Sequence, residues 1–134
     1  MTRRDFLTAG AALAASSALA QDNLVKLRIA PLTLDIGKKR TVKTVAYNGQ
    51  VPGPLFRWKE GQNVTVEVTN DSPEADLVHW HGFHIPAEVD GAMEEGTLMV
   101  APHAKQRYSF TATPAGTRWY HSHVAGGRKY RSGT

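Results

Sequence analysis

The chain has 134 residues, with 16 Lys and Arg against 12 Asp and Glu and a formal net charge of +4. This length allows one small domain with a single core, and the spread-out positive charge, dense only at residues 128–131, argues against a nucleic-acid-binding module. Cysteine is absent, which excludes disulfides, zinc sites of the thiolate kind, thiol nucleophiles and copper centres with a cysteine ligand within this chain.

Residues 1–20 predict an export signal of the twin-arginine type. A pair of arginines precedes Phe6 and Leu7, an apolar stretch follows, and a small-x-small cleavage site occupies residues 18–20, as in bacterial export signals. An ordinary secretory signal that happens to contain two arginines is the alternative. The apolar stretch is too short for a stable membrane span. We therefore expect a mature chain that starts at Gln21 and is exported to the bacterial periplasm or the extracellular space.

The rest of the chain predicts β-strands separated by turns, and no helix longer than two turns. The strand segments are residues 24–29, 40–45, 63–69, 77–83, 106–112 and 117–123. Asn48-Gly49 and residues 52–54 are turn signals. The strictest alternation, in residues 63–69, predicts that Val64, Val66 and Val68 face a core while Thr65, Glu67 and Thr69 face water. Six short strands with frequent turns predict an all-β sandwich.

Five of the six histidines lie in or close to two of the predicted strands. His79 and His81 form one pair and His121 and His123 another, and residues two apart in a strand point to the same face. If the two strands are neighbours, four imidazoles converge. Imidazole binds copper, zinc and iron, with copper(II) bound most tightly among the divalent ions. The pattern predicts a metal site with more histidines than one catalytic zinc needs.

The residues around the histidines have different expected roles. Trp80 and Tyr120 point to the opposite face and are predicted core residues. His84 has the opposite parity from His79, so we expect it not to bind metal. His103 falls in a polar turn and is a predicted surface residue.

The segments His79-Trp80-His81-Gly82 and Trp119-Tyr120-His121-Ser122-His123 resemble the N-terminal domain of multicopper oxidases, which are laccase-like enzymes of three cupredoxin domains. The resemblance extends over residues 47–54, 60–62, 89–91 and 114–117. It implies a cupredoxin-type Greek-key β-sandwich over residues 21–134.

The resemblance also implies roles for individual residues. His79 takes the place of the type 2 copper ligand, and His81, His121 and His123 take those of type 3 copper ligands in a trinuclear cluster. In the family this cluster reduces dioxygen to water while a donor substrate is oxidised. Asp90 matches an acidic residue of the family that is implicated in proton delivery. The alternative is that Asp90 is only a turn residue.

Other parts of the family's machinery are expected from elsewhere. A type 1 copper with a cysteine ligand, and the other histidines of the cluster, belong to a C-terminal cupredoxin domain. The chain stops at Thr134, where the family continues into one more strand. We therefore expect an incomplete domain that lacks its last strand, holds half of the ligands, binds copper weakly and does not turn over alone. A cysteine-containing C-terminal domain or partner subunit, and an unidentified reducing substrate, are the implied partners.

Three alternatives remain open. A stand-alone periplasmic copper carrier without oxidase turnover would favour clustered methionines, but Met1, Met93 and Met99 are scattered. A subunit could complete its cluster across an oligomer interface. A zinc hydrolase would need a carboxylate base, for which Glu88 or Asp90 are candidates, and metal content separates zinc from copper.

Overall fold

The computed structural model describes residues 24–124 of the chain. The predicted export signal, the basic run at residues 128–131 and the place of the expected missing strand lie outside this range. Within it no helix is long and apolar enough to cross a membrane. The six predicted strands are confirmed: β1 (Leu24–Asp35), β2 (Thr41–Tyr47), β3 (Asn63–Asn70), β4 (Val78–His81), β5 (Lys105–Thr111) and β6 (Trp119–Ser122). Two one-turn helices, α2 (Ala87–Asp90) and the 3₁₀ helix η1 (Met93–Glu95), lie between β4 and β5.

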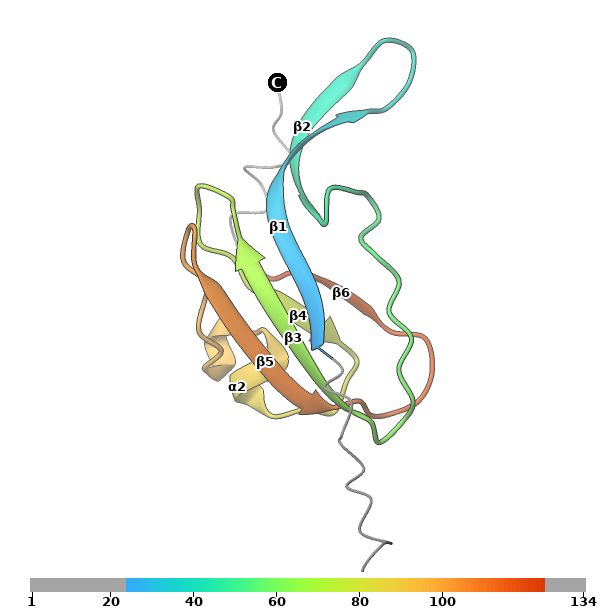
Figure 1. Cartoon of the computed structure of the whole chain (residues 1–134), viewed down its shortest axis with the longest axis vertical. Helices are drawn as coiled ribbons and strands as arrows, with labels where there is room; N and C mark the ends of the chain where they lie inside the picture. The colour runs from blue at the N-terminus through green and yellow to red at the C-terminus, as the bar shows by residue number, and fades with distance from the viewer. Residues whose placement is uncertain (1–23, 125–134) are drawn as a thin grey trace, which may run out of the picture.

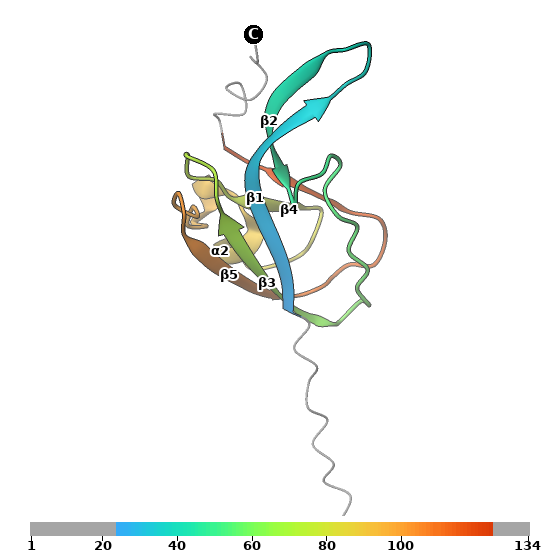
Figure 2. The ribbon, with the colours of Figure 1, turned by 45° about the horizontal axis from the view of Figure 1, so that its top comes forward.

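The strands form two sheets, as expected for a sandwich. The larger has the order β2-β1-β3-β5 and the smaller pairs β4 with β6. In Figure 1 the larger sheet lies in front of β4 and β6, and Figure 2 shows the β1–β2 hairpin standing clear of the two layers. The chain crosses between the sheets after β3, β4 and β5, so the two histidine-bearing strands become neighbours although β5 separates them in sequence.

The core between the sheets follows the predicted alternation. Val64, Val66 and Val68 are each at most 1% exposed, and Trp80 of β4 meets them from the smaller sheet at 1% exposure. Thr65, Glu67 and Thr69 alternate with these buried residues and are half-buried. Tyr120 packs against the core as a partly buried residue. The inward side of β4 and β6 is thus committed to packing, and their outward side is left for the histidines.

Strand β1 is longer than the segment that the sequence predicts. Its first half pairs in parallel with β3, and its second half pairs antiparallel with β2 through Asp35. Pro31 interrupts the sequence pattern, yet it is paired with Val45 of β2. Proline lacks an N–H to donate and is tolerated where a strand has a partner on one side only.

Candidate metal centre

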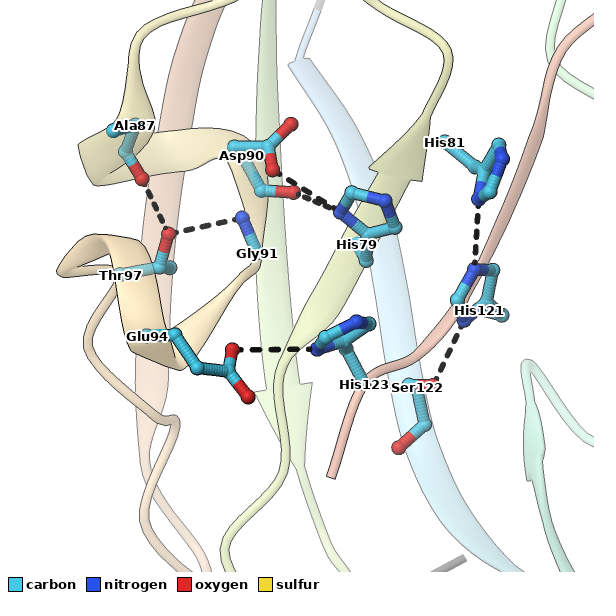
Figure 3. Close-up of polar contacts among 10 residues, drawn as sticks. All are labelled: His79, His81, Ala87, Asp90, Gly91, Glu94, Thr97, His121, Ser122 and His123. Atoms are coloured by element: carbon cyan, nitrogen blue, oxygen red, sulfur yellow. Dashed lines mark hydrogen bonds and ion pairs between the residues drawn. The ribbon is translucent and has the colours of Figure 1, made fainter. Parts of the chain in front are cut away.

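The pairing of β4 with β6 brings the two histidine segments together. The antiparallel register sets His79 opposite His121 and His81 opposite Trp119. Because side chains alternate along each strand, the outward face of this small sheet carries all these histidines, while Trp80 points inward. Figure 3 shows the imidazoles of both strands gathered beside the segment that contains α2 and η1.

Three of the histidines form a compact set of potential metal ligands. His79, His81 and His121 each offer a ring nitrogen, and these atoms all lie within 4.8 Å of one another. Nδ1 of His81 faces Nε2 of His121 at 3.4 Å. The rings of His79 and His121 are 5.2 Å apart between centroids.

Hydrogen bonds to backbone carbonyls determine which nitrogen carries the proton in two of these rings. Nδ1 of His79 lies 2.9 Å from the carbonyl oxygen of Asp90, and Nδ1 of His121 lies 2.8 Å from that of Ser122. A carbonyl oxygen only accepts, so in both rings Nδ1–H donates and the lone pair resides on Nε2. Ligand histidines in metal sites are oriented by the same kind of bond.

His123 lies beside this set but outside it. Its ring centroid is 5.1 Å from that of His79, and its Nδ1 lies 3.7 Å from a carboxylate oxygen of Glu94. The expected four-histidine arrangement therefore appears as three converging rings with a fourth at their edge. His84 and His103, predicted not to bind metal, are exposed and do not belong to the set.

Asp90 lies directly against the histidines. Its carboxylate Oδ2 is 3.2 Å from Nδ1 of His79, and both side chains are largely buried. Glu88, the other carboxylate considered as a base, is exposed and is not part of the histidine group. Of the two, only Asp90 has a contact with a candidate ligand.

The protonation of His121 favours metal binding. Burial is the largest cause that lowers the pKa of this ring, and the neighbouring His79, His81 and His123 lower it further, against the hydrogen bond to Ser122. A lowered pKa keeps the imidazole neutral at neutral pH, and only the neutral ring offers a lone pair to a metal ion.

Trp119 covers one side of the site. Its side chain is 58% exposed, yet its ring lies 4.2 Å from that of His121 and 4.7 Å from that of His81 between centroids. Such ring contacts restrict the orientation of the two imidazoles.

Asp76 is a buried carboxylate behind β6 that the sequence interpretation missed. It is 4% exposed, and its Oδ1 accepts hydrogen bonds from Oγ of Ser122, at 2.6 Å, and from the backbone N–H of Leu77, at 2.8 Å. Ser122 stands between His121 and His123, so Asp76 ties the histidine strand to the start of β4. No sequence signal marks this role, because the partner is 46 residues away.

Replacing Asp76 with asparagine is expected to stabilise the chain at neutral pH and to change little in acid. Burial raises the pKa of Asp76 above its ordinary value of 3.8. The folded state therefore holds the proton to higher pH than the unfolded state, so the stability present below about pH 3.8 is lost as the pH rises through the raised pKa. Asparagine keeps the Oδ1 acceptor and does not ionise.

Denaturant unfolding of both proteins at about pH 3 and about pH 7.5 measures this effect. The change, between the two pH values, in the difference of their unfolding free energies reports the ionisation of Asp76. A variant that is less stable than the native chain at the higher pH would contradict the assignment.

The chemistry of this donor set fits a copper ion. Three imidazole nitrogens converge without a thiolate, two have their lone pair on Nε2, and imidazole suits copper and zinc. The carboxylate closest to the set, that of Asp90, faces Nδ1 of His79, which is the nitrogen turned away from a metal ion bound at Nε2.

Comparison with known sequences also indicates a copper protein. A family model described as multicopper oxidase matches residues 29–134. The copper resistance protein A homolog of Pseudomonas syringae pv. tomato is 44% identical over 87 residues, which cover 65% of this chain and 14% of that protein. The multicopper oxidase MmcO of Mycobacterium tuberculosis is 36% identical over 94 residues, covering 70% of this chain and 18% of that protein. The chain thus matches less than a fifth of the length of these relatives.

Solved structures share the fold. The blue copper oxidase from Nitrosomonas europaea superposes with a TM-score of 0.72 at 38% identity, over 77% of this chain and 33% of that one. The multi-copper oxidase from Pseudomonas thermotolerans superposes with a TM-score of 0.72 at 31% identity, over 76% of this chain and 25% of that one. The two-sheet arrangement is therefore that of a domain within larger oxidases.

Proposed function

Because this chain belongs to the multicopper oxidase family and has the cupredoxin-type fold of such enzymes, we propose that it is a copper-binding N-terminal domain of an exported oxidase. In this proposal the chain supplies half of the histidine ligands of a trinuclear copper cluster. His79 would hold the type 2 copper, and His81, His121 and His123 would hold the type 3 coppers. Copper supplies the one-electron chemistry by which dioxygen is reduced to water while a donor substrate is oxidised.

The observation that carries this proposal is the register of β4 against β6. With His79 opposite His121, three ring nitrogens lie within 4.8 Å of one another. The hydrogen bonds of His79 and His121 to backbone carbonyls leave Nε2 of each ring free. Both rings are therefore already oriented for metal binding in the metal-free chain.

Asp90 has a place in this proposal as a proton-handling group. Its Oδ2 lies 3.2 Å from Nδ1 of His79, so the carboxylate stands at the edge of the histidine set. In the complete oxidase it would hold and deliver protons to reduced oxygen, and it also helps to keep the His79 ring in place.

In this proposal the remaining copper ligands of the oxidase belong to another domain or to a partner subunit. The chain contains no cysteine, so a type 1 copper site must come from another cupredoxin domain or a partner subunit. The export signal proposed for residues 1–20 would direct the protein out of the bacterial cytoplasm, into the oxidising compartment where dioxygen and the donor are available.

Copper titration and oxygen uptake test the proposal together. The purified chain is expected to bind copper(II), and the variants His84→Ala and His103→Ala are expected to bind it equally well because both side chains lie outside the set. With a phenolic donor, the copper-loaded chain alone is expected to consume no oxygen in a sustained way. Failure to bind copper would contradict the proposed site, and sustained copper-dependent uptake would contradict the half-cluster.

A further inference from the structure

The segment from residue 87 to residue 97, which we call the acidic clasp, faces the histidines with two carboxylates. Asp90, at the end of α2, contacts His79, and Glu94, in η1, lies near His123 (Figure 3). Both turns are short and carry no side-chain cap at their N-terminal ends. Something other than helix propensity must hold this segment in shape.

Thr97 closes the acidic clasp from inside the protein. It is 2% exposed, and its Oγ1 donates a hydrogen bond to the carbonyl oxygen of Ala87 at 2.6 Å and accepts one from the N–H of Gly91 at 2.9 Å. Its own backbone N–H donates to the carbonyl of Ala92. One buried hydroxyl thus uses both its donor and its acceptor capacity to join the start of α2 to the residue that ends it.

The peptide group that Thr97 holds also orients His79. The N–H of Gly91 and the carbonyl of Asp90 belong to the same planar peptide unit. Its N–H is held by Thr97, and its carbonyl oxygen accepts the hydrogen bond from Nδ1 of His79 at 2.9 Å. Asp90 supplies both acceptors near this nitrogen, its carbonyl oxygen at 2.9 Å and its carboxylate Oδ2 at 3.2 Å. If the peptide unit rotated, Asp90 would shift relative to the ring and the hydrogen bond that determines its protonation would be disturbed.

We propose that Thr97 is a positioning residue of the metal site: through the Asp90–Gly91 peptide it keeps His79 in the Nδ1–H tautomer, with the lone pair of Nε2 available to copper. The inference rests on the proposed copper-binding function for its purpose, but the tautomer itself is a property of the metal-free chain. Thr97 lies 18 positions after His79 in the sequence and is linked to the ring by hydrogen bonds through this peptide.

The tautomer is the measurement that separates positioning from packing. In the metal-free chain labelled with ¹⁵N, at a mildly alkaline pH where imidazoles are neutral, long-range ¹H–¹⁵N correlation spectra distinguish Nδ1–H from Nε2–H rings. The native chain is expected to show His79 as Nδ1–H. Thr97→Val keeps the size of the side chain but loses the hydroxyl, and is expected to show a mixture of tautomers, whereas Thr97→Ser keeps the hydroxyl and is expected to restore the native signal.

Two results would overturn the proposal. One is a native chain in which His79 is mainly Nε2–H, a measurement that needs no variant and so holds even if Thr97→Val fails to fold. The other is a folded Thr97→Val protein with the native tautomer. Ser72→Ala is the matched control, because Ser72 is a buried hydroxyl that bonds Oδ1 of Asn70 and the carbonyl of Glu74, and its loss is expected to leave His79 unchanged.

Copper affinity provides the second readout. Loss of a group that orients a ligand histidine lowers metal affinity about 10–100-fold, and we expect Thr97→Val to fall in this range and Thr97→Ser and Ser72→Ala to stay near the native value. A native chain with the Nδ1–H tautomer but no copper binding would defeat the proposed function and leave the positioning role of Thr97 intact. An unchanged affinity in folded Thr97→Val would defeat the positioning role alone.

Discussion

Replacing His121 with alanine is expected to lower the copper affinity of the chain by at least ~100-fold, beyond the upper end of what the loss of an orienting group causes. The His121 ring neighbours each of the other three: its centroid lies 5.2 Å from that of His79, 5.6 Å from that of His81 and 6.1 Å from that of His123. Its removal leaves no ring in β6 that belongs to the converging set.

Competition with a chelator of known affinity measures the change. His103→Ala is the matched control, since it removes an exposed imidazole from a turn outside the set. Far-ultraviolet circular dichroism checks that both variants keep the strands. An affinity for copper in His121→Ala equal to that of the control would show that the ion binds elsewhere on the chain.

Replacing Gly91 with alanine is expected to have the largest effect on stability, at least about 3 kcal/mol, and to weaken copper binding as well. Gly91 has a φ of +84°, and a Cβ there would lie 1.9 Å from the carbonyl oxygen of Val78 and 2.5 Å from Cα of His79. These are backbone atoms of β4 and cannot rotate away. The acidic clasp would have to move off the strand and take the Asp90 carbonyl away from His79.

Gly37→Ala is the matched control for this substitution. Gly37 has the same φ of +84°, in the β1–β2 hairpin, but a Cβ there meets nothing within 4 Å. Only the backbone penalty remains, about 1–2 kcal/mol. Denaturant unfolding and copper titration of both variants measure the difference, and equal losses in the two would contradict the argument from close contact.

The sequence predicts those parts of the protein that depend on local pattern. The alternation of Val64, Val66 and Val68 is enough to predict a buried face, because β3 lies between two other strands and packs on one side. The same two-residue period places His79 and His81 on the outward face, opposite to Trp80. Neither result needs knowledge of a distant partner.

Features that depend on distant partners are not predicted. Thr97 and Asp76 have no local pattern that distinguishes them from turn residues, and their roles follow from hydrogen bonds to Ala87, Gly91 and Ser122. Buried polar groups of this kind are stable only once the fold supplies their partners. The second half of β1 was missed for a related reason, since its pairing with β2 outweighs the interruption at Pro31.

The position of the histidines on two strands has a consequence for the stability of the copper-free protein. A metal ion held jointly by His81 and His121 would join two points 40 residues apart, in a chain that has no cysteine with which to form a disulfide. Such an ion is a reversible cross-link of the folded state. Because it is released on unfolding, it stabilises the fold by an amount that grows with the logarithm of its free concentration relative to its dissociation constant. With copper bound in this way, metal supply and resistance to proteolysis would be coupled, and the copper-starved chain is expected to be the form that proteases remove first.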